Sequence, residues 1–297
     1  MRYALIAGLA VLFFIALLWQ RPSPRTDSET DANQEAILID DNLVYHLHDP
    51  SQVALLENDL DEISGLAYVD ETTLATVNDE EGIIFLWNTQ EEQIIGEIDF
   101  GKDGDYEGVE IVQAPDGSTI AYVLRSDGDL YEVTSLHDDP QTRKYENALS
   151  DRNDTEGLAY DTKQQTLLVA CKATGEVNDL PSDRETLVYA YQPEAPDPLQ
   201  AVLRQPDEEK KRLHPSGIAR HPLTQRLYVL FSANHKIAIF DSASQLYQMI
   251  DLPVAWFPQA EGICFASDGT LFIANEKKKK GKATILRFTA QLKNTQP

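Results

Sequence analysis

Five copies of one short phrase recur along this chain, and their spacing is the feature that most constrains its fold. The phrases are EISGLA from Glu62, DYEGVE from Asp105, DTEGLA from Asp154, HPSGIA from His214 and QAEGIC from Gln259. The steps between their glycines are 43, 49, 60 and 45 residues, for Gly65, Gly108, Gly157, Gly217 and Gly262. A period of about 40 to 50 residues indicates a propeller, in which each repeat forms one small sheet.

Within a repeat, apolar and β-branched segments alternate with polar turns. The first repeat predicts four antiparallel strands, at 63–69, 73–77, 83–87 and 93–99. The last repeat has three such segments, so we expect residues 52–57 to cross over and supply its fourth strand, which closes the circle. Five phrases therefore predict an all-β, five-bladed β-propeller of four-stranded antiparallel blades over residues 42–297. A sixth blade would require a degenerate phrase within the long third repeat.

The amino terminus carries an uncharged apolar run from Tyr3 to Trp19. At about 1.5 Å per residue, this run is near the lower limit for spanning a bilayer. It lacks the small-residue cleavage site of a signal peptide, so we expect residues 1–21 to be one uncleaved transmembrane signal anchor with an extracytoplasmic body behind it. Residues 22–41 lack apolar periodicity and predict a disordered acidic linker. The folded part is expected to begin between Asp41 and Gln52.

The chain is strongly acidic. Its 297 residues include 49 Asp and Glu against 25 Lys and Arg, a formal net charge of -24. Nucleic acid is therefore excluded as an expected partner, because phosphate binding needs clustered basic residues. The acidity fits either a soluble surface or a cation-binding role. The two cysteines, Cys171 and Cys264, lie in apolar segments and are expected to be buried thiols, although a disulfide stays open as the alternative.

Polar residues occupy the same places in every phrase. The position before the glycine holds Ser64, Glu107, Glu156, Ser216 and Glu261, and the position three before it holds Glu62, Asp105, Asp154, His214 and Gln259. Positions two apart in an extended chain face the same side. The next antiparallel strand returns to the same face and ends in polar residues such as Asp79, Arg125, Lys172 and Glu276. We therefore expect carboxylates from several blades to meet at one mouth of the central channel.

Carboxylates crowded on one axis repel each other, and protonation, pairing with Arg125 and Lys172, or a bound cation would relieve the repulsion. Oxygen ligands without cysteine suit Ca²⁺. The candidate metal ligands are Glu62, Asp79, Glu107, Glu156, Glu261 and Glu276. As alternatives, the acids make only turn hydrogen bonds at strand starts, and the glycines serve only close strand packing or a bulge.

Taken together, the phrases, the NDEEG segment from Asn78 and the GDYEGVE segment from Gly104 resemble those of the bacterial SdiA-regulated family, also called YjiK-like proteins. The resemblance covers roughly residues 50–290. It implies a five-bladed propeller behind an amino-terminal membrane segment, a Ca²⁺ site and distant kinship to NHL-repeat propellers, with no established activity. It places the expected protein in the bacterial inner membrane as a single-pass protein with its propeller in the periplasm.

Two main classes of function follow, beside a third in which the chain is a non-enzymatic assembly scaffold that uses its outer blade edges or the Lys277–Lys280 loop. The first is a membrane-anchored, calcium-binding propeller of the cell envelope that binds an unknown small molecule or protein. The second is a metal-dependent hydrolase, a phosphoesterase or lactonase, whose channel carboxylates hold a metal that activates water. No G-x-S-x-G motif is present in the sequence, and His214 and His235 are the candidates for proton transfer.

Overall fold

A computed structural model of the chain describes residues 36–293, except positions 115, 137–138, 147, 176, 178–184, 194, 196–198 and 280. This part forms strands β1 to β23 and two short 3-10 turns, η1 at Asn58–Leu60 and η2 at Ser232–Asn234. None of the helical segments in these described residues has the length and apolar character needed to cross a bilayer. The predicted anchor over residues 1–21 lies outside the described residues.

The first four-stranded sheet shows why these segments become strands. It joins β4 (Ile63–Asp70), β5 (Thr73–Asn78), β6 (Ile83–Asn88) and β7 (Gln93–Asp99) antiparallel in that order. β5 is an apolar and β-branched run, and all six of its side chains are buried. β7 instead alternates between exposed and more buried residues over most of its length, as an outer strand with one solvated face does. Burial thus decreases from the inner strands to the outer edge.

Three further sheets repeat this order. Their strands are β8 (Tyr106–Gln113), β9 (Thr119–Arg125), β10 (Leu130–Thr134) and β11 (Gln141–Tyr145); β12 (Thr155–Asp161), β13 (Thr166–Cys171), β14 (Thr186–Tyr191) and β15 (Leu199–Arg204); and β16 (Gly217–Arg220), β17 (Leu227–Phe231), β18 (Lys236–Phe240) and β19 (Leu246–Asp251). The four-stranded antiparallel blades predicted from the phrases are therefore confirmed.

The last four-stranded sheet joins the two ends of the folded chain. It contains β20 (Ala260–Phe265), β21 (Leu271–Asn275) and β22 (Thr284–Phe288), and β3 (Gln52–Leu55) pairs antiparallel with β22. Ala54 opposite Ile285 and Val53 opposite Leu286 set the register. The crossover strand expected within residues 52–57 is thus present, and it pairs the edge that β22 would otherwise expose.

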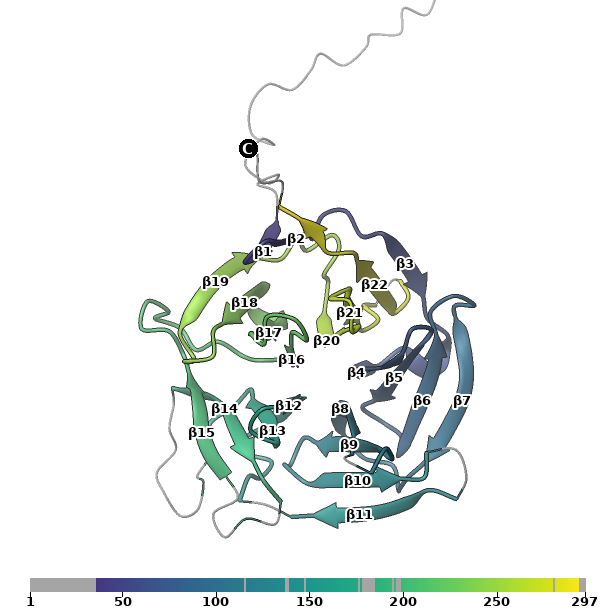
Figure 1. Ribbon diagram of the computed structural model, residues 1–297. Helices are drawn as coiled ribbons and strands as arrows, with labels where there is room; N and C mark the ends of the chain where they lie inside the picture. The colour runs from purple at the N-terminus through teal and green to yellow at the C-terminus, as the bar shows by residue number, and fades with distance from the viewer. Residues whose placement is uncertain are drawn as a thin grey trace, which may run out of the picture. The chain divides into compact units, whose positions relative to one another are not determined.

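The five inner strands surround one channel. β4, β8, β12, β16 and β20 each pack against the inner strands of the two neighbouring sheets, so that the ring closes between β20 and β4 (Figure 1). Five hydrophobic clusters fill the wedges between adjacent sheets. The core is therefore distributed around the ring, and burial of these apolar side chains holds the sheets together.

The expected count of five sheets is wrong, because the structure has six. β1 (Ile37–Asp40), β2 (Leu43–His46) and β23 (Gln291–Leu292) form an additional three-stranded antiparallel sheet. It does not come from the third repeat, the place where a degenerate phrase was expected for any sixth blade. The first strand also begins at Ile37, before the expected start of the folded part and inside the range 22–41 expected to be a linker.

A buried carboxylate anchors this sixth sheet to the repeats. Asp40 is fully buried, forms an ion pair with Arg226, and accepts hydrogen bonds from Thr224 Oγ1 at 2.6 Å and Tyr228 Oη at 2.9 Å. Hydrogen bonds to each oxygen compensate for removing the charge from water. These polar contacts thus fix the sheet to β17 and to the turn that precedes it. The pattern of apolar residues in the sequence does not predict them.

Candidate functional site

The phrase glycines coincide with irregular strand pairing in all but one repeat. In four of the five inner strands the pairing register shifts at the phrase, between Ile63 and Gly65, Tyr106 and Gly108, Thr155 and Gly157, and Ala260 and Ile263. A bulge of this kind re-aims a side chain out of the regular alternation. The residue before the glycine therefore points toward the channel, where Glu107, Glu156 and Glu261 line the space around the axis.

The glycines also allow the blades to approach closely. A Cβ atom at Gly65 would lie 2.8 Å from the backbone nitrogen of Val109, and one at Gly217 would lie 2.1 Å from the carbonyl oxygen of Glu261. Both contacts are with backbone of the next inner strand, which cannot move aside as a flexible side chain can. The two structural roles considered for the glycines, a bulge and close packing, thus occur together.

The two phrases with serine instead of glutamate use it to join blades. Ser64 Oγ donates to the carbonyl oxygen of Tyr106 at 2.5 Å, and Ser216 Oγ donates to that of Ala260 at 2.8 Å. Both acceptors lie two residues before the glycine of the next phrase. The ring is therefore asymmetric, with three glutamates and two blade-bridging hydroxyls before its glycines.

Burial and mutual repulsion act on the three channel glutamates. Burial, followed by the charges of Glu156 and Asp105, raises the pKa of Glu107 far above its usual range. Burial and the charge of Glu156 raise the pKa of Glu261 to about 8. Burial also raises the pKa of Glu156, although the hydrogen bond and the charge of Lys172 oppose this rise. These groups therefore resist ionisation in the absence of a compensating cation.

The other three predicted ligands lie beside them. Burial, then the charges of Glu62, Asp105 and Glu80, raises the pKa of Asp79 to about 6. The pKa of Glu276 is raised by burial, by a hydrogen bond and charge from Glu62, and by the charge of Asp79. Because Glu261 also interacts with Glu276, the six predicted side chains form one electrostatically connected group. We call this end of the channel the phrase mouth, defined by Glu62, Asp79, Glu107, Glu156, Glu261 and Glu276.

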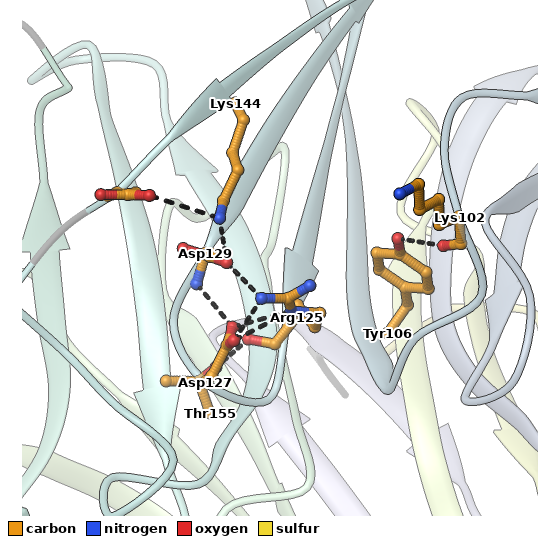
Figure 2. A network of polar contacts seen from close by, with 8 residues as sticks. Lys102, Tyr106, Arg125, Asp127, Asp129, Lys144 and Thr155 are labelled. Carbon is orange, nitrogen blue, oxygen red and sulfur yellow. Dashed lines mark hydrogen bonds and ion pairs between the residues drawn. The ribbon is translucent and has the colours of Figure 1, made fainter.

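Of the two cations expected to pair with the acids, one does so. Lys172 Nζ lies 2.6 Å from Glu156 Oε1, which is 5% exposed. Arg125 instead binds Asp127 and Asp129, with its Nε 3.0 Å from Asp127, and Lys144 adds a 2.7 Å ion pair to Asp129 (Figure 2). Arg125 is therefore engaged by Asp127 and Asp129, and of the two expected cations only Lys172 compensates the charge of a channel glutamate.

A cavity of about 300 Å³ opens beside the glutamates at the phrase mouth. Its lining includes Lys172, His214, His235, Ser232 and Glu261. His214 Nδ1 lies 3.1 Å from the carbonyl oxygen of Lys172, and Ser232 hydrogen-bonds to Glu261. Both histidines were predicted candidates from the sequence, whereas Ser232 was not, because it lies on η2 outside any repeated motif. Deeper in the channel, where the phrases meet, the free volume falls to about 10 Å³.

The donor chemistry of the phrase mouth fits a hard cation. Its donors are carboxylate oxygens, and Asp79 Oδ1 is buried without a hydrogen-bond partner, which leaves an oxygen free for an ion. Across residues 36–293, gaps excepted, no three His, Cys, Asp or Glu side chains come close enough together to hold a single metal ion. Binding would therefore require the acids to draw closer. Both cysteines are buried free thiols, as expected.

The ring of four-stranded sheets with its axial acids defines the chain as an all-β propeller. Among solved structures, Myxococcus xanthus glutaminyl cyclase has a similar fold: it is 14% identical, with 82% of this chain and 96% of that chain covered and a TM-score of 0.54. Virginiamycin B lyase from Staphylococcus aureus is 13% identical, with 83% and 74% covered and a TM-score of 0.42. A protein of unknown function from Bacteroides caccae is 12% identical, with 72% and 70% covered and a TM-score of 0.45.

A comparison with curated protein sequences finds no match. The sequence profile of the SdiA-regulated family matches residues 45–279, and the chain belongs to the SdiA-regulated family. The resemblance drawn from the five phrases is therefore confirmed.

Proposed function

We propose that this protein is a calcium-binding β-propeller, anchored in the bacterial inner membrane with its propeller in the periplasm, which binds a ligand or protein partner. The observation that carries the proposal is the gathering of six carboxylates from distant repeats at the phrase mouth, with the pKa of Glu261 raised to about 8. Such a group is unstable as a set of free anions and is neutralised by a divalent cation. The uncharged run from Tyr3 to Trp19 supports the anchor.

Calcium binding also supplies a reason for the asymmetry of the ring. Glu107, Glu156 and Glu261 stand before the glycine in three of the five phrases, whereas the other two phrases have an uncharged serine at that position. Lys172 neutralises part of Glu156. The net negative charge therefore concentrates on the remaining acids, where an ion with six to eight oxygen ligands would be held.

The test is a calcium titration of the purified full-length protein, followed by thermal melting after removal of divalent cations with a chelator. A ligand that binds the native state stabilises it by RT ln(1 + [L]/Kd), about 2.7 kcal/mol at 100 times Kd. We expect calcium to raise the melting temperature of the wild type and to have less effect on Glu107→Gln. A matched control, Glu97→Gln on the exposed face of β7, should respond like the wild type. Identical melting in calcium and in chelator would remove the proposal.

A second candidate function is hydrolysis, favoured by the cavity that places His214 and His235 beside Glu261. A metal held by the acids would supply an activated water, and His214 would hold or move a proton within the cavity. Purified protein should then cleave phosphate esters or lactones, and both Glu107→Gln and Glu156→Gln should reduce the rate. Activity that survives both substitutions would exclude a mechanism at the phrase mouth.

A further inference from the structure

A second cavity, also of about 300 Å³, lies on the axis beyond the closed middle of the channel, at the ends of the inner strands opposite the phrases. Residues three positions after each phrase glycine line it together. They are Tyr68, Ile111, Tyr160, Arg220 and Phe265, one from each of the five inner strands. We call this space the far cavity, defined by those five residues and Glu110. Its volume is at the lower end of the range for small-molecule sites.

Glu110 is an unusual residue for such a place. It occupies the position two after the phrase glycine, where the other repeats have Ala67, Ala159, Ala219 and Cys264. It is partly accessible, and it lines the far cavity. Among the described residues no basic side chain forms an ion pair with it. Burial raises the pKa of Glu110 to about 8, while hydrogen bonds from the backbone N–H groups of Ile111 and Tyr160 oppose the shift.

The one cation in the lining is committed elsewhere. Arg220 Nη2 lies 2.7 Å from Asp161 Oδ2, and its Nη1 donates to the carbonyl oxygen of Gln225 at 2.8 Å. Arg220 Nε and Gln225 Oε1 are buried without hydrogen-bond partners. The far cavity is thus lined by a carboxyl group that has no ion-pair partner among the described residues. It is also lined by two side chains that each bury one polar atom without a hydrogen-bond partner, which is costly.

We propose that the far cavity is a second axial site, which binds a small organic ammonium ion. The ammonium group would lie against Glu110, whose charge it compensates. The organic body would pack on Tyr68, Tyr160 and Phe265, whose ring faces attract cations and bury apolar surface. A strongly hydrated metal ion is a poorer fit, because one carboxylate and aromatic walls do not replace its water shell.

The far site is independent of the proposed calcium site. Glu107 and Glu110 lie on the same strand, three residues apart, so their Cα atoms are separated by about 10 Å. The channel between the two ends holds about 10 Å³ of free volume, which is room for about one water molecule. Substitutions of the two glutamates should therefore affect different ligands.

The experiment uses phenethylamine as the probe and 2-phenylethanol as its neutral isostere, with full-length protein in chelator at neutral pH. Calorimetry or thermal shift should show saturable phenethylamine binding to the wild type and to Glu107→Gln, and at least tenfold weaker binding to Glu110→Gln. The alcohol should bind weakly and equally to all three proteins. Tyr160→Leu, which keeps the carboxyl group, should also weaken amine binding. No saturable amine binding to the wild type, or equal amine binding by wild type and Glu110→Gln, would overturn the proposal.

The proton balance supplies a second measurement. Near neutral pH an ammonium ion that binds beside a protonated Glu110 should displace about one proton, which calorimetry in buffers of different ionisation enthalpy detects. The other titratable groups in the lining are Tyr68, Tyr160, Cys264 and Arg220. Burial raises the pKa of Tyr160 and of Cys264, which moves both groups further from neutral pH. Amine binding without proton release in the wild type would also count against an ionic contact with Glu110. If calcium no longer stabilises Glu107→Gln while this variant still binds the amine, the two sites are independent of each other.

Discussion

Glu261 makes the stability of this propeller depend on pH in a predictable direction. The pKa of its carboxyl group is raised from 4.5 to about 8 in the folded state, chiefly by burial and then by the charge of Glu156. Between these two values the native state binds a proton that the unfolded state has released, so the free energy of unfolding must fall as pH rises. At about 1.36 kcal/mol for each pH unit, the full loss approaches about 5 kcal/mol.

The predicted perturbation is Glu261→Gln, which keeps the shape of the side chain and removes its charge. Wild type and variant should have similar stability below about pH 5, and the variant should be more stable by several kcal/mol near pH 8.5 in chelator. For a domain of this size that difference corresponds to about 10 °C in melting temperature. Saturating calcium should restore much of the wild-type stability at high pH and stabilise the variant less.

Thermal or urea unfolding from pH 5 to 9, with and without calcium, measures these differences. Glu97→Gln, a substitution on the exposed face of β7, is the control and should keep the wild-type slope. Parallel pH profiles for wild type and Glu261→Gln would refute the reasoning, because they would mean that Glu261 ionises as readily in the folded state as in the unfolded chain.

Two further predictions concern the frame around the channel. Asp40→Ala removes a fully buried partner of an arginine and should lower the free energy of unfolding by about 3–5 kcal/mol in urea titrations. The control Asp251→Ala, at a side chain that is 84% exposed and pairs with Lys236, should change it by less than about 1 kcal/mol. Gly217→Ala forces a Cβ to within 2.1 Å of the Glu261 carbonyl oxygen and should strongly reduce the yield of folded protein, while Gly96→Ala, whose nearest contact is 3.4 Å, should melt near the wild-type temperature. If a test variant and its control had the same stability or the same yield of folded protein, the packing described for that position would be contradicted.

Much of the ring was predictable because one local pattern recurs. The repeated phrase predicts an inner strand, and the missing last strand of the fifth repeat predicts the crossover by β3. The sixth sheet was not predictable in the same way. Its strands β1 and β2 have four residues each, follow a polar segment, and pair with a strand of two residues, Gln291–Leu292. Elements this short carry too few periodic residues to stand out from a loop.

The sequence predicts where the acidic residues of the candidate site lie along the repeats, but it does not predict which cation pairs with which acid. Repetition places equivalent residues around one axis, and the six expected acids interact electrostatically at the phrase mouth, although among the described residues no three of them are close enough to hold one ion. Which cation pairs with which acid depends on side-chain geometry. Asp127 and Asp129 lie two and four residues after Arg125, in the turn after β9. Arg125 pairs with these nearby carboxylates instead of with the channel glutamates.

The bulge found in four of the five phrases determines which residues face each end of the channel. It turns the residue before the glycine toward the phrase mouth, and beyond it the strand resumes a pleat that brings the residue three positions later to the far cavity. Position along a single strand therefore decides which end of the propeller a side chain serves, as Glu107 and Glu110 on β8 show. Because the middle of the channel is packed, with about 10 Å³ free, a charge at one end gains little compensation from a ligand at the other. The calcium ion and the organic ammonium ion proposed above would therefore act at separate ends of the channel, each beside its own carboxylates.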